Sequence, residues 1–263
     1  MNCHDPFYFF LIAFKFINNL FRTPLNGIIG IIDINSKSSD MELIEENRQK
    51  ARCAAQQLLS LLNEVLDMSR LEHGETVLTN ELFHLSELTA ALQDTMQIHA
   101  ADSGIILICD SYTVPSNCER VYGSPIYIQK IFFNIIENAI KYNKPGGRID
   151  TYAKELSCDG KQAFYEFGIT DTGIGMQKEF VKNKLFQPFT QEKTDARTQY
   201  KGSGLGMSIV KGLIESMNGS IQVESVPGEG TTFTFQLPFL LDDTACSNRK
   251  REQTAETDAA GMK

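Results

Sequence analysis

The feature that most constrains this chain is a seam of apolar residues that recur at alternating intervals of three and four. Six residues between positions 51 and 68 form it: Ala51, Ala54, Leu58, Leu61, Val65 and Met68. Such spacing is typical of a helix that packs lengthwise against another helix. Four further residues widen the seam into a broad apolar face: Ala55, Leu59, Leu62 and Leu66. A helix with so broad an apolar face needs several neighbours.

A second apolar helix is predicted upstream, over residues 7–37. The polar stretch Ser36 to Asp40 suits a turn between the two helices, and His73-Gly74 ends the second one. A single hairpin of this kind leaves an apolar face open, and two hairpins close it as a four-helix bundle. We therefore predict a dimerising hairpin over residues 1–75; the alternative is a hairpin that packs on its own C-terminal domain.

From about residue 80 the pattern changes to short strands and amphipathic helices. Strands are predicted over 105–109, 149–156, 163–170, 220–225 and 231–237, and helices over 85–100, 124–142 and 206–217. Because helices do not alternate regularly with these strands, we predict a mixed or mainly antiparallel sheet with helices on one face. The predicted fold is α+β, with this α/β sandwich over residues 80–240. Residues 241–263 are polar and aperiodic, and we expect a disordered tail.

Charge and hydropathy restrict the partners. A net charge of −8 and a pI near 5.1 argue against nonspecific binding to nucleic acid. The apolar run at residues 7–14 is too short to span a bilayer and lacks the flanks of a signal peptide. We therefore expect no transmembrane segment and a cytoplasmic location. The alternatives are a membrane-surface anchor and the soluble part of a membrane-associated sensor.

One predicted helix carries polar residues on a single face. Asn134, Asn138 and Lys141 lie at positions i, i+4 and i+7 of an otherwise apolar helix. Amide oxygens are hard donors that suit Mg²⁺ beside phosphate oxygens, and a lysine one turn further on suits a phosphate. The alternative is an ordinary solvated stripe.

Three glycine-rich turns follow. Asp171-Thr172-Gly173-Ile174-Gly175 comes after a strand, and its carboxylate can accept a hydrogen bond from an exocyclic amine. The segment 202–206 (Gly-Ser-Gly-Leu-Gly) opens a helix, where backbone N–H groups favour an anion. The segment 228–233 is a turn between strands. Each motif alone is a weak signal. The phenylalanines of 185–189 and the polar stretch to Lys201 suggest a lid over a ligand.

In this order the motifs resemble the N, G1, F, G2 and G3 boxes of the Bergerat-type (GHKL) ATP-binding fold. That fold occurs in histidine kinases, gyrase-type topoisomerases, Hsp90 chaperones and MutL-type repair proteins, and residues 185–237 look most like hybrid sensor histidine kinases. The resemblance implies that Asn138 coordinates Mg²⁺ beside Asn134, and that Asp171 holds the adenine amine of ATP. It also implies nucleotide-binding or pocket-shaping roles for the remaining motif residues: Lys141, Tyr142, Gly173, Gly175, Phe189, Gly202, Gly204, Leu205, Gly206, and Thr231 or Thr232.

The segment 18–25 resembles the phosphoacceptor box of the same family, which usually reads Ser-His-Glu/Asp-apolar-Arg-Thr-Pro-Leu. Here Asn19 stands at the histidine position and Leu20 at the acidic position. A neutral amide is a poor nucleophile, so phosphorylation at the usual site is predicted to be absent. The resemblance implies that Thr23 positions water for dephosphorylating a response regulator. The alternative is a pre-proline threonine bonded to its own backbone.

The sequence thus resembles the core of a histidine kinase that passes phosphoryl groups from ATP–Mg²⁺ to a histidine and on to a response regulator receiver domain. It would act as a homodimer, or as a heterodimer with an intact kinase. The alternative is a pseudokinase that serves as an ATP-binding scaffold or response-regulator phosphatase. A GHKL ATPase or chaperone is disfavoured, because Asn134 stands where those proteins carry a water-activating glutamate. A misread frame upstream of Phe21 would also account for Asn19.

Overall fold

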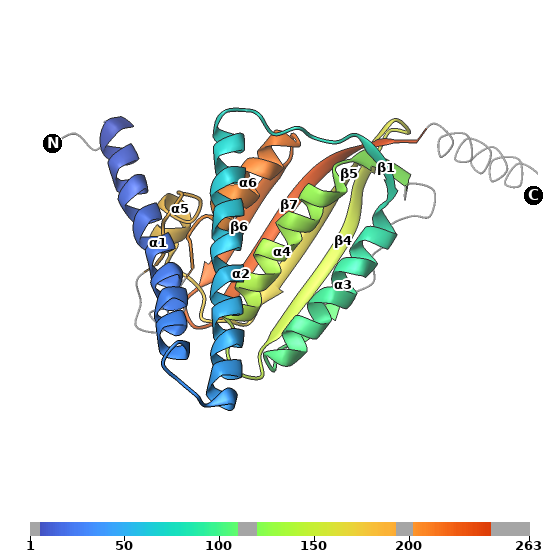
Figure 1. Ribbon diagram of the computed structural model, residues 1–263. Helices are drawn as coiled ribbons and strands as arrows, with labels where there is room; N and C mark the ends of the chain where they lie inside the picture. The colour runs from blue at the N-terminus through green and yellow to red at the C-terminus, as the bar shows by residue number, and fades with distance from the viewer. Residues whose placement is uncertain (1–5, 110–119, 193–201, 243–263) are drawn as a thin grey trace, which may run out of the picture.

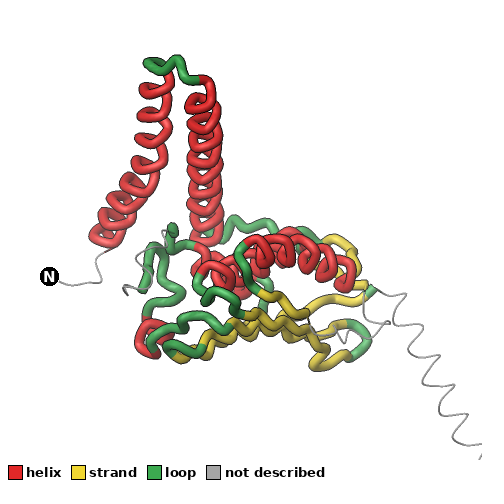
Figure 2. The backbone as a smooth tube through the Cα atoms, turned by 90° about the horizontal axis from the view of Figure 1, so that it is seen from below, coloured by secondary structure: helices red, strands yellow, loops and turns green. Residues whose placement is uncertain are grey.

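The computed structural model describes residues 6–109, 120–192 and 202–242, with side chains of the first helix described from Leu20 onward. It contains a hairpin of two long helices followed by a sheet with helices on one face (Figures 1 and 2). This arrangement confirms the predicted fold class. Most of the predicted tail and most of the predicted lid lie outside the described residues; the tail was predicted to begin at residue 241, but Leu241 ends the last strand of the sheet. No helix in the described part of the chain combines the length and apolarity needed to cross a membrane.

The hairpin consists of α1 (Pro6–Asn35) and α2 (Met41–Glu72). Asp40 caps α2, because its carboxylate accepts hydrogen bonds from the backbone N–H groups of Glu42 (3.0 Å) and Leu43 (3.3 Å). Near the turn, buried Asn47 donates to the Asn35 side chain across 2.8 Å and ties the two helices together. Both predicted helices and the predicted turn are therefore present.

The apolar face of the hairpin is divided between two environments. Leu61 is buried, whereas the wider face of both helices is exposed at Leu25, Ile29, Ile32, Leu59, Leu62 and Leu66. The C-terminal part of α2 instead packs on the core of the α/β portion through Val65, Met68 and Leu71. The hairpin thus docks on its own C-terminal portion and still presents an uncovered apolar face.

The described residues form one seven-stranded sheet in the order β1-β3-β7-β5-β4-β2, with β6 also paired to β7. Its strands are β1 (Glu81–His84), β2 (Ile106–Cys109), β3 (Arg120–Gly123), β4 (Arg148–Cys158), β5 (Gln162–Asp171), β6 (Ser220–Val226) and β7 (Gly230–Leu241). The β2–β4 pair is parallel, and the other pairs are antiparallel. The sheet is therefore mixed and mainly antiparallel, as predicted.

Helices α3 (Leu85–Asp102), α4 (Pro125–Lys141) and α6 (Gly206–Ser216) cover one face of the sheet (Figure 1). A short helix, α5 (Lys178–Asn183), lies beyond β5. Phe132 of α4 meets Phe167 and Phe235 of the central strands edge to face, with centroids 5.4 and 5.3 Å apart. This aromatic cluster fixes α4 on the sheet, and α4 carries the polar stripe predicted above.

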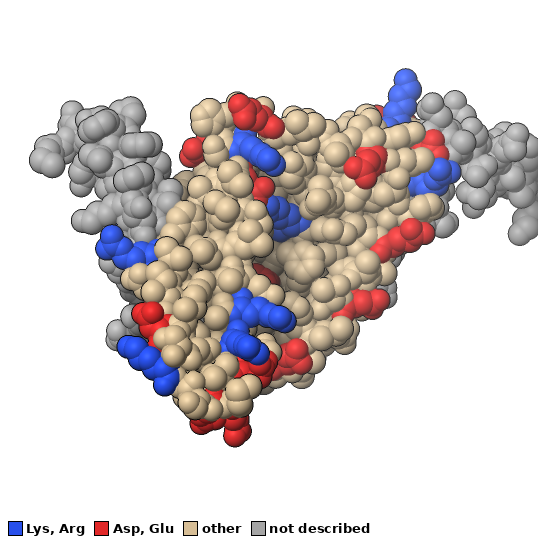
Figure 3. Space-filling model, viewed as in Figure 1, with Lys and Arg blue, Asp and Glu red and all other residues tan. Residues whose placement is uncertain are grey.

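Charged side chains of both signs are present on the face of the molecule that Figure 3 shows. Among the described residues on the face seen in Figure 3, acidic and basic groups are interspersed and do not gather into one basic patch.

The uncovered face of the sheet carries a polar cluster around Glu166. Its carboxylate accepts hydrogen bonds from Lys154 (2.7 Å), Tyr152 (3.0 Å) and Gln236 (2.9 Å). The hydrogen bond from Lys154, followed by that from Gln236, lowers the pKa of Glu166 below its ordinary value. The pKa of Glu166 is lower in the folded chain than in the unfolded chain. The hydrogen bonds to its carboxylate therefore stabilise the fold fully at pH values above the unfolded pKa, and this stabilisation is lost as the pH falls through the folded pKa.

Glu166→Gln should therefore lower the free energy of unfolding at pH 7, by at most about 1 kcal/mol since Lys154 is half exposed and solvent screens the pair. The difference from the wild type should shrink as the pH falls from about 4.5. Urea unfolding at several pH values measures it. Glu224→Gln, an exposed glutamate on β6, is the matched control. A difference that persists unchanged at acid pH would contradict the assigned cause.

Candidate nucleotide-binding pocket

A pocket of about 210 Å³ lies between α4, the loop that follows β5, and the segment that leads into α6. Its walls come from most of the predicted motifs. The predicted residues that line it are Asn134, Asn138, Lys141, Tyr142, Asp171, Gly175, Gly202, Gly204, Gly206 and Thr231. Segments separated by about a hundred residues in the chain thus converge on one cavity.

The stripe on α4 forms one wall. Asn134 donates from its side-chain nitrogen to the backbone oxygen of Lys130 (2.8 Å), so its Oδ1 is directed toward the start of α6. A Cβ atom at Gly206 would lie 2.8 Å from that Oδ1, and one at Gly202 would lie 2.9 Å from Lys141 Nζ. The glycines therefore let the loop approach the amide and the ammonium group closely. The same lysine lies over the Tyr142 ring, 5.2 Å from its centroid.

Asp171 is buried at the end of β5. Its Oδ1 accepts a hydrogen bond from the backbone N–H of Gly173 (2.8 Å), which holds the following turn. Gly173 packs against the backbone oxygen of Tyr142, and Gly175 has a left-handed backbone (φ 63°) against the backbone of Val226, so a Cβ at either position would collide. Gly173 shapes this turn and is not among the lining residues.

The segment before α6, residues 202–205, is held by hydrogen bonds of Ser203 and by close backbone packing at Gly204. The Ser203 hydroxyl accepts from the backbone N–H of Leu205 (3.1 Å) and donates to the Glu64 carboxylate. Gly204 has a left-handed backbone (φ 69°), and a Cβ there would lie 2.9 Å from the backbone of Phe189 and Thr190. Leu205 is fully buried and Phe189 packs against the core. The side chains of Leu205 and Phe189 therefore pack in the core and support the loop, and neither residue lines the pocket.

The register of β7 distinguishes the two threonines. Thr231 lines the pocket and shares a hydrogen bond with Ser225 (2.9 Å). Thr232 lies on the other face of the sheet, where its hydroxyl contacts that of Thr170 (3.1 Å). Because side chains alternate along a strand, only one of the pair can face the pocket. Of the two predicted threonines, Thr231 is therefore the one that lines the pocket.

Several lining residues were not predicted. Met176, Phe180, Leu185 and Phe233 form an apolar wall, and Glu137 and Glu64 contribute carboxylates. The apolar residues have a detectable signal, because they lie inside or beside the motifs. Glu64 has no such signal in the sequence, because it lies on α2 and lines the pocket only because that helix packs on the C-terminal portion of the chain. Burial raises the pKa of its carboxyl, and this outweighs the hydrogen bond from Ser203.

The described side chains of the phosphoacceptor-like segment, from Leu20 onward, do not line the pocket. Asn19 falls within α1, but its side chain lies outside the described residues. Thr23 is exposed on the same helix and is not a lining residue. The structure therefore brings most of the predicted nucleotide residues to one cavity, and Thr23 is not among the residues that line it.

Comparisons with known proteins match both parts of the chain. The ATPase domain common to histidine kinases, DNA gyrase B and HSP90 matches residues 123–241, and the His Kinase A (phospho-acceptor) domain matches residues 21–74. The autoinducer 2 sensor kinase/phosphatase LuxQ of Vibrio harveyi is 32% identical over 219 residues, 82% of this chain and 25% of LuxQ. Sensor protein GacS of Pseudomonas syringae is 35% identical over 229 residues, 84% of this chain and 24% of GacS. The chain thus spans about a quarter of the length of these relatives.

Solved structures agree with the fold. Full-length ShkA in complex with AMPPNP superposes with a TM-score of 0.64 at 25% identity, covering 90% of this chain and 46% of ShkA. The histidine kinase ThkA, solved in complex with the response regulator TrrA, superposes with a TM-score of 0.61 at 21% identity, covering 84% of this chain and 59% of ThkA. With a phosphoacceptor-type hairpin followed by the matching ATPase domain, the chain belongs to the histidine kinase family.

Proposed function

We propose that this chain is the core of a two-component histidine kinase and binds ATP with Mg²⁺ in the pocket beside α4. The observation that carries the proposal is the convergence of the α4 stripe, Asp171 and the Gly202–Gly206 segment on one cavity. The bound nucleotide in ShkA supports it. Titration of the full chain with ATP and Mg²⁺ tests it, and the sharpest variant, at Asp171, is argued in the Discussion.

The donor set fits the nucleotide and the metal. At one end of the pocket the buried Asp171 carboxylate and Thr231 lie beside an apolar wall, which suits an adenine ring and its amine. At the other end Asn134, Asn138 and Lys141 lie close to the glycines of the loop before α6, which suits phosphates. Asn138 would hold Mg²⁺, which when bound neutralises charge on the phosphates.

The α4 wall favours holding ATP over hydrolysing it. Asn134 occupies the place of a water-activating glutamate, and its side-chain nitrogen is engaged by the Lys130 carbonyl. An amide cannot accept a proton from water at neutral pH. We therefore propose that the ATP is kept for transfer to a protein acceptor, in the cytoplasm, with a response regulator as the next recipient.

Asn19 supports a second candidate function. With an amide at the acceptor position, this chain would act as a pseudokinase: an ATP-binding scaffold, a response-regulator phosphatase that uses Thr23, or a kinase of an intact heterodimer partner. The two candidates share the nucleotide pocket and differ only in the acceptor. The Asn19 variants in the Discussion separate them.

A dimer is proposed from the exposed apolar face of the hairpin. Leu62→Glu together with Ile29→Glu should weaken self-association at least about 100-fold, because dimerisation would bury unpaired charges. Sedimentation velocity across a concentration series measures this. Val77→Glu, at an exposed apolar residue outside the hairpin helices, is the control and should leave association unchanged. If the double variant associates as the wild type does, the dimer interface lies on another surface.

A further inference from the structure

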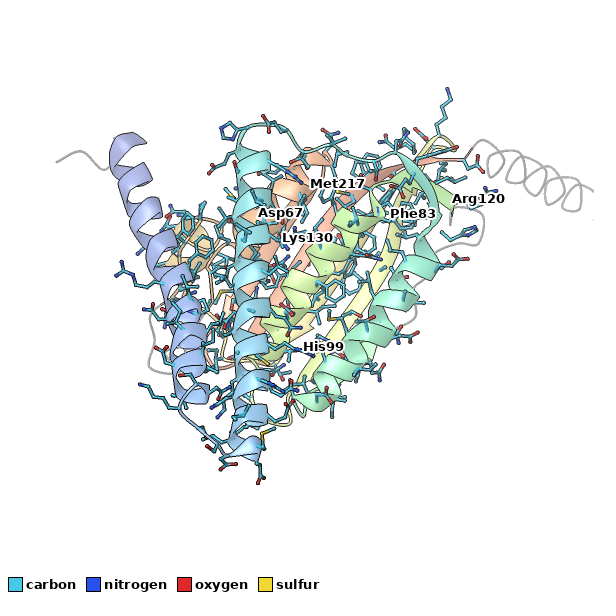
Figure 4. The ribbon with its side chains drawn as sticks, viewed as in Figure 1. Asp67, Phe83, His99, Arg120, Lys130 and Met217 are labelled. Atoms are coloured by element: carbon cyan, nitrogen blue, oxygen red, sulfur yellow. The ribbon has the colours of Figure 1, made fainter. Side chains whose placement is uncertain are left out.

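Helix α2 of the hairpin is fastened to the nucleotide-binding portion at several points. Asp67 forms an ion pair with Lys130 of α4, and Figure 4 shows these two side chains facing one another between the helices. Leu71 packs on Gly212 of α6, where an added Cβ would lie 3.1 Å from its side chain. Val65 and Met68 of the same helix also pack on the core. The position of α2 relative to the pocket is therefore fixed by both apolar and charged contacts.

This docking places Glu64 at the phosphate end of the pocket. Its carboxylate accepts the hydrogen bond of Ser203, which lies between Gly202 and Gly204, and Glu64 itself is a lining residue. Ser203 is buried and Glu64 half-buried. The Ser203 hydroxyl also accepts from the N–H of Leu205, so the carboxylate is linked to the turn that begins α6. The negative charge of Glu64 therefore lies in the part of the pocket wall where we expect the phosphates of the nucleotide.

A carboxylate in that place opposes phosphate charge. Like charges several ångströms apart in a partly buried and partly solvated site repel strongly enough to change the affinity about threefold per unit charge. ATP carries about one more negative charge than ADP, and adenosine carries none. The raised pKa of Glu64 agrees with a carboxylate that is poorly solvated in this position. Lys130 is the cation beside it, and Glu137 is a second carboxylate at the rim.

We propose that Glu64 sets the nucleotide preference of this pocket: while the hairpin is docked, its carboxylate penalises each added phosphate and so favours ADP over ATP. ATP then binds well only when α2 moves away, which couples the state of the hairpin to the state of the nucleotide. This inference rests on the proposed nucleotide function. It adds a residue from outside the ATPase domain to the determinants of specificity.

The test is calorimetric titration of the full chain and its Glu64→Gln variant with adenosine, ADP and ATP, in Mg²⁺ at fixed ionic strength. Glutamine retains an oxygen that accepts from Ser203 and removes only the charge. The variant should bind ATP about tenfold more tightly than the wild type, ADP about threefold more tightly, and adenosine equally well. Glu72→Gln, at an exposed residue that ends the same helix and lies outside the pocket lining, is the charge-matched control and should change none of the three affinities.

A second variant tests the dependence on docking. Asp67→Asn removes the ion pair with Lys130, and the Glu64→Gln effect on ATP should be smaller in that background because the carboxylate no longer stays in the pocket. Equal effects of Glu64→Gln on all three ligands would overturn the inference. So would a weaker affinity for ATP, because Glu64 would then be holding the metal. If the wild type binds none of the ligands, the proposed nucleotide function itself fails, and the inference fails with it.

Discussion

Asp171→Asn should lower the affinity of the full chain for ATP by about 10- to 100-fold. The buried carboxylate lines the pocket, and one of its oxygens already holds the Gly173 N–H at 2.8 Å. Asparagine can preserve that contact through its own oxygen, but it turns an NH₂ group toward the place expected for the adenine amine. Two donors then face one another, and a buried donor left unpaired costs about 1–3 kcal/mol.

The base dependence makes this experiment specific. Guanine carries a carbonyl where adenine carries its amine, so the asparagine variant should lose much of the preference for ATP over GTP. Calorimetric titration with both nucleotides measures the change. Thr232→Val is the control, because that side chain lies on the other face of the sheet beside Thr170 and should leave both affinities unchanged. Wild-type affinity for ATP in the Asp171→Asn variant would show that adenine lies elsewhere in the pocket.

The elements that were predicted correctly are those with a local and repeated signal. The seam of α2 and the polar stripe of α4 are read from one helix at a time, because a helix places residues three and four apart on one side. The strands β1 and β3 were missed, because each has four residues that mix apolar with polar or small side chains, whereas the equally short β2 is a continuous apolar run. β3 pairs with β7 at one side of the sheet, and β1 pairs with β3. Such segments carry neither a continuous apolar run nor a recognisable alternation, and the neighbouring strand decides their structure.

The site prediction was also limited to what the local sequence can indicate. Motif membership predicted the pocket, but it did not separate residues that face the cavity from residues that support it. Gly173 and Leu205 belong to the right motifs and serve the turn and the core. The choice between Thr231 and Thr232 depends on strand register, which is a property of the paired sheet. Glu64 depends on the docking of α2, for which the chain has no local signal.

Asn19→His combined with Leu20→Asp should convert an unlabelled chain into one that takes phosphate from ATP. Phosphoryl transfer needs positioning, charge compensation and a nucleophile in line, and the pocket supplies the first two. An imidazole nitrogen is a competent nucleophile, and an adjacent carboxylate orients it, whereas an asparagine amide offers neither function. Incubation of the purified chain with γ-labelled ATP should give acid-labile, base-stable label at least about 100-fold above the wild-type level.

Two controls locate the label. Asn19→Ala with Leu20→Asp carries the same new charge without the imidazole and should stay unlabelled, and adding Asp171→Asn to the histidine variant should suppress its label by removing ATP. Label on the wild-type chain would show that another residue accepts phosphate and that Asn19 does not silence it. If the histidine variant binds ATP and still takes no label, the acceptor is not the only function that has changed. Glu64 would then be the next position to alter, because we propose that its carboxylate opposes the phosphates of ATP while α2 is docked.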